Sequence, residues 1–499
     1  MRREIIDRLE RALGAAAVTT DDTELLVYEC DALAIFKNKP DAVVFPANTQ
    51  QVAEAVRIAN EYRIPFLPRG SGTGLSGGAM AIDGGIIIEL QRMNRILSVD
   101  VENRFAVVQP GVVNIHISQA VAPHGLYYAP DPSSQSACSI GGNVAENAGG
   151  PHCLKYGMTT NHILAIEAVL STGEVVRLGN TAGEACGMDL VGAIVGSEGT
   201  FAIVTEITVR LLPKAQAVKT LLAAYKSFEE CSQTVSDIVA GGIVPAALEF
   251  MDDKTIVAVE ASVYRAGYPL DARAVLLIEV DGFSDGLNET AAEIIEICRR
   301  NNAYDVRVAK DEEERARLWM GRKGSFGAMG RISPDMMVMD AVIPRTRLPE
   351  VLAEINRISE QYQLPVANVF HAGDGNLHPL ILFDSRRQDQ VDKILTMGEE
   401  IMRFCVGVGG ALSGEHGVGC EKADFMEMVF TESDLQTMAN VKRVFNPSGL
   451  LNPSKIFPTH RGCTEIGRPG TTSTEEIGKR VEKMLLGQKP RAHSVLPVR

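Results

Sequence analysis

The 499-residue chain lacks the sequence features that mark several common classes of protein. Its nine cysteines are scattered and include no C-x-x-C pair, so the ligand spacing of iron–sulfur and zinc-finger sites is absent. No stretch reaches the roughly 18 apolar residues that a membrane-spanning helix needs. Basic residues are not in excess either. The formal net charge is -14, which argues against nucleic-acid binding because phosphate contacts require a basic face.

What remains is the composition of a soluble globular protein, with 45% hydrophobic and 22% charged residues. A chain of this length predicts roughly two or three domains rather than one core. The odd number of scattered cysteines is typical of reduced thiols in a cytoplasmic protein. Residues 1–10 predict a charged amphipathic helix and not a signal peptide, so membrane association is expected only through a partner.

The first part of the chain begins with a β-α-β pattern. Residues 42–47 predict a strand, and Asn48, with Gln51 three residues later, predicts the cap of a helix that ends near Tyr62. A second strand is predicted at 64–68. Further strands are predicted at Ile96–Asp100, Phe105–Gln109, Ile163–Leu170 and Ile203–Val209.

After Pro213 the pattern changes to a regular alternation of strands and helices, which predicts an α+β domain with an antiparallel sheet. The strands are expected near Thr220–Tyr225, Ala246–Met251, Ala274–Val280, Met336–Ile343 and Val366–His371. The helices are expected near Phe228–Val239, Glu289–Asn301, Glu312–Gly324, Leu348–Gln363 and Gln388–Gly407.

The most informative segment is the glycine-rich loop Arg69-Gly-Ser-Gly-Thr-Gly-Leu-Ser-Gly-Gly78. It lies between two predicted strands, at 64–68 and 84–90, rather than between a strand and a helix. Glycines leave backbone N–H groups accessible and allow left-handed turns, so such a loop can bind a diphosphate. Rossmann and P-loop motifs are disfavoured, because each opens a helix and no Gly-Lys-Ser/Thr is present. The alternative is a turn without a ligand.

Two further tracts of small residues strengthen the ligand interpretation. One contains Pro130–Ser134, Ser139–Asn143 and Ala145–Gly150, and the other is Gly196–Thr200. Three such tracts in one domain are hard to explain as ordinary hairpins. They indicate several loops that converge on one extended ligand.

A candidate metal site lies in His371-Ala-Gly-Asp-Gly-Asn-Leu-His378. A four-residue hairpin loop at Gly373–Asn376 would place His371 and His378 opposite each other, with Cβ atoms roughly 5 Å apart. Two imidazoles and one carboxylate suit Zn²⁺ or a similar ion with an open position for substrate. The alternative is a pair of structural histidines that bond backbone groups.

Two weaker segments complete the set of candidate residues. In Ser413-Gly-Glu-His-Gly417, Glu415 could supply the missing carboxylate and His416 a base that titrates near neutral pH. Without other support this segment is a surface turn. In Leu318-Trp-Met-Gly-Arg-Lys323, Arg322 beside the only tryptophan would suit a bidentate carboxylate clamp, although a lone arginine on a helix is more often solvated.

Together these segments resemble the vanillyl-alcohol-oxidase-type (PCMH-type) FAD-binding flavoproteins and, within them, the FAD-linked D subunits of bacterial glycolate oxidases. The resemblance extends from about residue 20 to residue 460. Its most specific stretches are Pro68–Gly78, Tyr127–Gln135, Ser139–Gly150, His371–His378 and Ser413–Gly417.

The resemblance implies an α+β protein built around a two-part, PCMH-type FAD-binding domain. The implied parts are an N-terminal helical segment (1–37), the FAD-binding domain (38–215), a substrate-binding α+β cap with an antiparallel sheet (216–412), a helical C-terminal return to the FAD domain (413–460) and a polar, poorly ordered tail (461–499).

The resemblance also implies which residues bind FAD. They are Arg69, Gly70, Ser71, Gly72, Thr73, Gly74, Ser133, Gly141, Asn143, Gly196 and Ile203. Some relatives tether the flavin through a histidine of the first loop. Thr73 occupies that position here, so the FAD is expected to be noncovalent.

Related D-2-hydroxyacid dehydrogenases bind a divalent metal through two histidines and a glutamate, which implies His371, His378 and Glu415 as ligands. His416 is the implied catalytic base and Arg322 the implied anchor for the substrate carboxylate. Those relatives carry a lysine in a Tyr-Lys-Tyr-Asp segment, where this chain reads Met337-Val-Met-Asp340. The second anchor is therefore missing, which favours a small hydroxy acid over hydroxyglutarate.

The expected function is FAD-dependent oxidation of glycolate, and of D-lactate, by hydride transfer to the flavin. Electrons are expected to pass to a second flavoprotein subunit and an iron–sulfur subunit at the inner face of the cell membrane. Two alternatives remain open at this point. One is a stand-alone D-lactate dehydrogenase that uses a quinone or cytochrome, and the other is a flavin-bearing assembly subunit without turnover.

Overall fold

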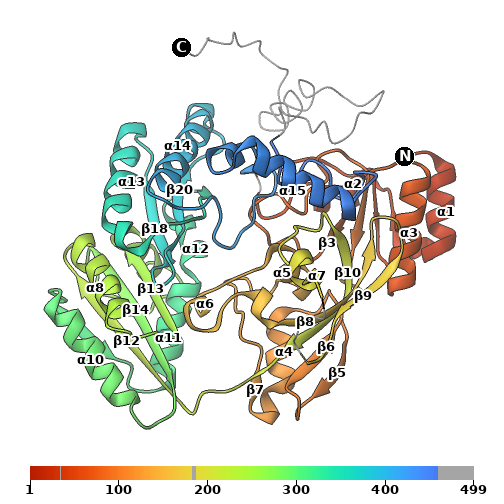
Figure 1. The fold of residues 1–499 in the computed structure, drawn as a ribbon. Helices are drawn as coiled ribbons and strands as arrows, with labels where there is room; N and C mark the ends of the chain where they lie inside the picture. The colour runs from red at the N-terminus through yellow and green to blue at the C-terminus, as the bar shows by residue number, and fades with distance from the viewer. Residues whose placement is uncertain (34, 183–186, 459–499) are drawn as a thin grey trace.

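The computed structural model describes residues 1–33, 35–182 and 187–458 of the chain. Two lobes lie side by side, one built from the first half of the chain and one from the second (Figure 1). The helix α15 (Glu432–Phe445) runs back over the first lobe near the end of the described chain. The predicted polar tail at 461–499 lies outside the described residues.

The first lobe begins with a four-stranded sheet in the order β1-β2-β4-β3. Its strands are β1 (Val18–Thr19), β2 (Ala42–Val44), β3 (Phe66–Arg69) and β4 (Ile86–Glu89), and the last three run parallel. The helices of this region are α1 (Arg3–Leu13), α2 (Asp22–Leu25) and α3 (Thr49–Glu61). The side chain of Asn48 accepts a hydrogen bond from the Gln51 N–H, so the predicted helix cap is confirmed.

A second, antiparallel sheet completes this lobe in the order β5-β6-β10-β8-β9. Its strands are β5 (Ile96–Asp100), β6 (Phe105–Val108), β8 (Ile163–Leu170), β9 (Val175–Gly179) and β10 (Ala202–Arg210). Apolar residues of α4 (Asn114–Val121), α5 (Ile140–Glu146) and α7 (Leu190–Ile194) share its hydrophobic core. The remaining elements are the paired β7 (Leu126–Tyr127) and β11 (Leu212–Pro213), and the single turn α6 (Cys153–Tyr156).

The second lobe is an antiparallel sheet in the order β15-β12-β14-β13-β18, which continues through β19 and β20 to β17 and β16. The strands are β12 (Ala217–Tyr225), β13 (Ala247–Asp252), β14 (Ala274–Gly282), β15 (Asp305–Val308), β16 (Asp335–Val338), β17 (Ala341–Val342), β18 (Val366–His371), β19 (Asn376–Leu377) and β20 (Pro379–Phe383). This arrangement confirms the α+β fold class.

Helices cover both faces of this sheet (Figure 1). The cluster on one face includes α8 (Phe228–Ala240), α10 (Leu287–Arg300), α13 (Leu348–Tyr362) and α14 (Gln388–Gly407). The cluster on the other face includes α9 (Asp253–Glu260), α11 (Glu312–Lys323) and α12 (Ser325–Ala328). Leu221 and Ala223 of β12 face the first cluster while Leu222 and Ala224 face the second, which explains why this strand is apolar throughout.

Short 3₁₀ helices connect several of these elements. They lie at Ala15–Ala17, Leu26–Tyr28, Ala122–His124, Thr159–His162, Met329–Arg331, Arg345–Arg347 and Ala423–Met428. The chain after α15 returns to the first sheet, where Phe66 N–H donates to Leu450 O (2.9 Å) and Asn452 N–H donates to Phe66 O (2.7 Å).

Three local expectations were wrong or incomplete. The second glycine-rich tract is not loop throughout, because Ser139 accepts from the Gly142 N–H and starts α5. The strand predicted at Met336–Ile343 is interrupted between β16 and β17. The elements α9, β15 and β20 were missed, because the first two begin with charged residues and the third directly follows the His371–His378 segment, which was interpreted only as a turn.

We expect Asn48→Ala to lower the free energy of unfolding of the first lobe by about 1 kcal/mol, because it removes the acceptor for the Gln51 N–H (3.0 Å). Urea denaturation followed by circular dichroism measures the change. Asn48→Asp keeps an acceptor and should remain close to wild type. Equal losses in both variants would contradict the capping role.

Candidate functional site

The glycine-rich loop connects the parallel strands β3 and β4, as the sequence predicted. Gly72 and Gly77 have φ angles of 67° and 76°, in the left-handed region that favours glycine. Arg69 holds the loop closed, because its guanidinium donates to Ala79 O (3.0 Å) and Cys30 O (2.8 Å). These two hydrogen bonds of the Arg69 side chain therefore stabilise the conformation of the loop.

A cavity of about 340 Å³ lies where this loop faces the second lobe. The first lobe lines it with Gly70–Leu75, Ala79, Pro132–Ser134, Cys138, Ser139, Gly142, Asn143, Glu146, Ala148 and Gly149. The later part of the chain lines it with Lys323, Phe326, His378, Glu415 and His416. A smaller cavity of about 70 Å³ shares Gly70, Ala79, Ser139, Gly142 and Glu146 with it. The two form one extended hollow between the glycine tracts.

Most of the predicted cofactor residues border this hollow. The larger cavity is lined by Gly70, Ser71, Gly72, Thr73, Gly74, Ser133 and Asn143, and the smaller by Arg69 and Gly141. Gly196 and Ile203 line neither cavity. The smaller one is bordered instead by their neighbours Ser197, Glu198, Gly199, Ala202 and Val204.

The predicted role of Ile203 at the cofactor stays a prediction, because strand alternation turns its side chain away from the smaller cavity while its two neighbours line it. Ile203 is 1% exposed, and its side chain belongs to the core shared with α3, whereas Ala202 and Val204 belong to the core on the other face of β10. Gly196 has a φ of 81°, in the left-handed region that favours glycine, and its N–H donates to Val144 O (2.9 Å).

The two histidines of the predicted metal site come together, but not in the predicted register. His371 pairs with Asn376 across the hairpin, so the four-residue loop is Ala372–Gly375 and His378 lies two residues beyond the position opposite His371. The two residues still share one face of the sheet, and their ring centroids are 5.2 Å apart. Glu415 joins them, because its Oε1 lies 3.2 Å from the Nε2 atom of each histidine.

Each histidine has a carboxylate opposite it on the neighbouring strand. Glu249 of β13 pairs with His371, and its two oxygens lie 2.8 and 2.9 Å from His371 Nδ1. The register of β16 and β17 with β20 and β19 places Asp340 opposite His378, with Oδ1 3.6 Å from Nε2. Sequence reasoning missed Glu249 entirely and named Asp340 only as the end of a segment, since neither strand order nor register is visible in a single chain.

Burial lowers the pKa of His371, but Glu249 and Glu415 outweigh it and hold that pKa well above the usual value. The same interaction acts in reverse on Glu415, where burial raises the pKa and His371 and His378 bring it well below the usual range. These opposed shifts are those of an ion pair between His371 and Glu415, and the same groups could instead bind one cation. His371, His378 and Glu415 have ligand atoms within 4.8 Å of one another.

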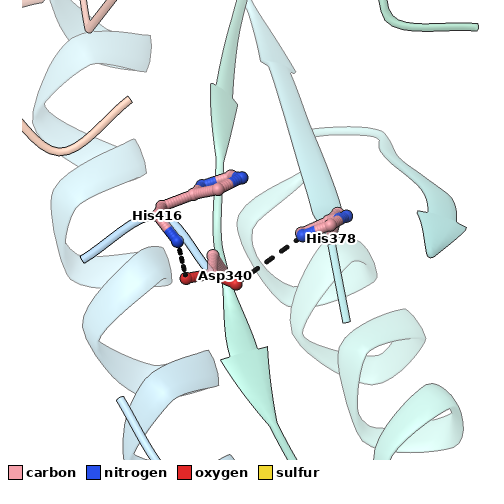
Figure 2. Close-up of side chains that lie close together, drawn as sticks. All are labelled: Asp340, His378 and His416. Carbon is pink, nitrogen blue, oxygen red and sulfur yellow. Dashed lines mark hydrogen bonds and ion pairs between the residues drawn. The ribbon is translucent and has the colours of Figure 1, made fainter. Parts of the chain in front are cut away.

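Asp340 anchors the loop that carries Glu415 and His416, and Figure 2 shows its contacts with His416 and His378. Its carboxylate accepts from the Ser413 hydroxyl (2.5 Å), from the backbone N–H of Gly414 (3.0 Å) and from that of His416 (3.2 Å). Lys422 Nζ donates to the same group at 3.1 Å. Burial raises the pKa of Asp340, but Lys422 and the nearby histidines outweigh it, so the group stays ionised.

The ring of His416 stacks on that of His378, with centroids 5.0 Å apart and planes 6° from parallel (Figure 2). Burial lowers the pKa of His416 to about 4, below the near-neutral value that the sequence suggested. The imidazole is therefore neutral at physiological pH. Its buried Nδ1 has no hydrogen-bond partner among the described residues, and the residue itself lines the cavity.

The role of Arg322 as carboxylate anchor stays a prediction. Its side chain is 1% exposed and does not line the cavity, and Nη2 forms an ion pair with Glu249 Oε2 at 2.6 Å. Arg322, Glu249, His371 and Glu415 thus form a continuous chain of alternating charges. The neighbouring Lys323 lines the cavity instead.

Comparison with known proteins agrees with this geometry. Residues 40–179 match the family model described as an FAD binding domain, and residues 214–456 match that of the C-terminal domain of FAD linked oxidases. The glycolate oxidase subunit GlcD of Escherichia coli (strain K12) is 48% identical over 466 residues, which is 93% of both chains. This chain belongs to the family of FAD-linked oxidases.

Other relatives of this FAD-linked oxidase carry two names. The glycolate oxidase subunit GlcD of Bacillus subtilis (strain 168) is 39% identical over 91% of this chain and 97% of its own. A D-lactate dehydrogenase of Anaerostipes hadrus is 34% identical over 85% of this chain and 91% of its own. Among solved structures, p-cresol methylhydroxylase with substrate bound has the same fold, with a TM-score of 0.78 at 16% identity over 91% of this chain and 96% of that one.

FAD is the cofactor of the family, and the hollow between the glycine tracts fits it. Its walls are largely backbone and small side chains, which leave amide donors accessible to a diphosphate. No helix of the described residues is both long enough and apolar enough to cross a bilayer.

We expect Gly142→Leu to abolish FAD binding while the protein remains folded. Gly142 lines both cavities, and a Cβ atom there would meet only Ser139 Oγ, at 3.3 Å, so the backbone tolerates a side chain that then fills the hollow. The flavin absorbance of the purified protein and its circular dichroism measure the two effects. Gly330→Leu is the control, since nothing lies within 4 Å of a Cβ at that position. Full flavin content in Gly142→Leu would contradict the placement.

Proposed function

We propose that this FAD-linked oxidase oxidises glycolate, and also D-lactate, to the corresponding 2-oxo acid. The observation that carries the proposal is that Gly70–Gly74 and the pair Glu415–His416 border one cavity of about 340 Å³. A cofactor-binding loop and a set of acid–base groups therefore face the same space. The names of the relatives, glycolate oxidase subunit and D-lactate dehydrogenase, support this substrate class.

Bound flavin supplies the acceptor for a hydride from the substrate. His416 is the residue we assign to the hydroxyl proton. Its imidazole is neutral, its Nδ1 is unpartnered among the described residues, and stacking on His378 fixes its plane. Asp340 positions it by accepting the His416 backbone N–H, so the base sits on a loop that is tied to the sheet.

His371, His378 and Glu415 would hold a divalent cation such as Zn²⁺, which would supply Lewis acidity to a substrate oxygen. The donor set fits, because Glu249 occupies His371 Nδ1 and leaves Nε2 directed at the proposed ion. A carboxylate behind a ligating histidine is the usual support of such sites. The FAD is noncovalent in this proposal, since the lining residue of the first loop is Thr73 and not a histidine.

The electrons are proposed to leave through a second flavoprotein subunit and an iron–sulfur subunit, at the inner face of the cell membrane. The word subunit in the names of the relatives supports a complex. The 34% identity with a D-lactate dehydrogenase keeps a stand-alone D-lactate enzyme as the second candidate. An assembly subunit without turnover is disfavoured, because it would have no use for a buried base beside the cofactor cavity.

We expect glycolate to bleach the flavin of the anaerobic protein, and His416→Gln to slow this reduction by roughly 100- to 10,000-fold, the usual contribution of a general base. Stopped-flow absorbance measures the rate. The variant should keep its flavin, because His416 does not belong to the glycine tracts. A wild-type rate in His416→Gln would remove the base from the proposal, and faster reduction by D-lactate than by glycolate would favour the second candidate.

Removal of the divalent ion by a chelator should slow flavin reduction by roughly 100-fold or more, since Lewis-acid stabilisation contributes several kcal/mol. Added Zn²⁺ should restore the rate. Elemental analysis before and after chelation shows whether an ion was present. Indifference to the chelator, with no metal found, would reduce His371 and His378 to structural residues.

A further inference from the structure

The middle of the cofactor hollow contains a carboxyl group that the mechanism above does not use. Glu146, the last residue of α5, lines both cavities, together with Gly70, Ala79, Ser139 and Gly142. These five residues mark the junction at which the two cavities meet. Glu146 is the only one of them with an ionisable side chain. An extended ligand that occupies both cavities therefore passes this carboxyl group.

The walls of the two cavities indicate which part of FAD lies at the junction. The smaller cavity is bordered by apolar side chains such as Leu90, Ile194 and Val204, which suit an aromatic ring. FAD is an extended molecule with a ring system at each end and the diphosphate and ribityl chain between them. With one ring system in each cavity, the diphosphate region lies at the junction, next to Glu146.

The carboxyl group of Glu146 is poorly supported as an anion. Its Oε2 atom is buried and has no hydrogen-bond partner among the described residues. Lys455 and Lys422 are the cations whose charges act on it, but both are bonded elsewhere. Lys455 Nζ donates to Met80 O (2.7 Å). Lys422 Nζ donates to Asp340 (3.1 Å). A buried charge without a partner is strongly destabilising, so the neutral acid is favoured at this position.

Neighbouring carboxylates disfavour the charged form further. Burial and the charges of Glu198 and Asp31 hold the pKa of Glu146 well above its usual value. Glu198 is the member of the pair that keeps its charge, because its two oxygens accept from the backbone N–H groups of Val418 (2.7 Å) and Gly419 (2.6 Å). The buried oxygen of Glu146 has no such donor, so Glu146 is the one that carries a proton.

We propose that Glu146 binds FAD as a neutral carboxylic acid, which donates a hydrogen bond to an oxygen of the diphosphate region. An ionised carboxylate would repel the diphosphate, whereas the protonated group has an O–H donor that matches an anionic acceptor. Among the described residues, no three potential ligand atoms that include one of Glu146 lie close enough together to hold a bridging metal ion. The assignment uses FAD as the cofactor of the family and does not depend on the identity of the substrate.

The test is the dissociation of FAD from the full-length protein, followed by the rise in flavin fluorescence on dilution. We expect Glu146→Ala to weaken FAD binding roughly 10- to 100-fold, as for the loss of a hydrogen bond to a charged group. Glu146→Gln keeps a neutral donor of the same shape and should bind nearly as tightly as wild type. Wild-type affinity in Glu146→Ala, or an equal loss in Glu146→Gln, would overturn the proposal.

Glu421→Ala is the matched control. Glu421 also has buried oxygens without a hydrogen-bond partner among the described residues, and burial raises its pKa to about 7, but it lines neither cavity. Its FAD affinity should therefore match that of wild type. Equal losses in Glu421→Ala and Glu146→Ala would assign the effect to a general loosening of the structure and remove Glu146 from cofactor binding.

The pH dependence of FAD binding separates a neutral donor from an ionised acceptor. The donor is fully present below the pKa of Glu146 in the flavin-free protein, and bound diphosphate raises that pKa further. FAD binding by wild type should therefore weaken as pH rises through this pKa, while Glu146→Gln, which has no proton to lose there, shows a flatter dependence. The same dependence in both proteins, or wild-type binding that strengthens with rising pH, would contradict the protonated state and overturn the proposal.

Discussion

The site depends on the pairing of each buried histidine with a carboxylate on the adjacent strand. Glu249 faces His371 and Asp340 faces His378, so a carboxylate flanks the two histidines on each side. A buried charge without a partner is strongly destabilising, and these groups are nearly inaccessible to water. The ladder therefore does two things at once. It stabilises the charged side chains and sets their spacing through backbone hydrogen bonds, which are more rigid than any loop.

Asp340 ties the loop of Glu415 and His416 to this ladder, and Glu415 adds contacts with both histidines. Asp340 accepts from four groups of the Ser413–His416 segment, the Ser413 hydroxyl and the backbone N–H groups of Gly414, Glu415 and His416, and from Lys422, which follows it. The same loop also reaches the first lobe, because Glu198 accepts from the backbone N–H groups of Val418 (2.7 Å) and Gly419 (2.6 Å). One short segment thus connects the sheet of the second lobe to the wall of the cofactor cavity. Small shifts between the lobes would move the base and the cofactor site relative to each other.

The sequence was sufficient to predict those features that depend only on residues close together in the chain. The cap at Asn48, the glycine loop between β3 and β4, and the convergence of His371 with His378 all follow from neighbouring residues. The predicted hairpin register was wrong by two positions. The sequence allows the four-residue turn at either Ala372–Gly375 or Gly373–Asn376, and the structure has the first. Glu249 could not be found, since its partner is 122 residues away and the strand order decides the contact. The ion pair between Arg322 and Glu249 could not be predicted for the same reason, because helix packing sets it.

The two halves of the site use different parts of the polypeptide, and this division explains how one cofactor site can serve several substrates. The first lobe contributes mainly backbone and small side chains, whereas the later part of the chain contributes the larger side chains of Lys323, Phe326, His378, Glu415 and His416. Val338 lies two residues before Asp340 and so points to the same face of the sheet, where it packs with the apolar cluster of α9 and α11. Val338 does not line the cavity, so this position offers no contact to a bound acid. The charged groups that border the cavity come instead from the end of α11 and from the loop of Glu415, while the glycine tracts supply the backbone that faces the cofactor.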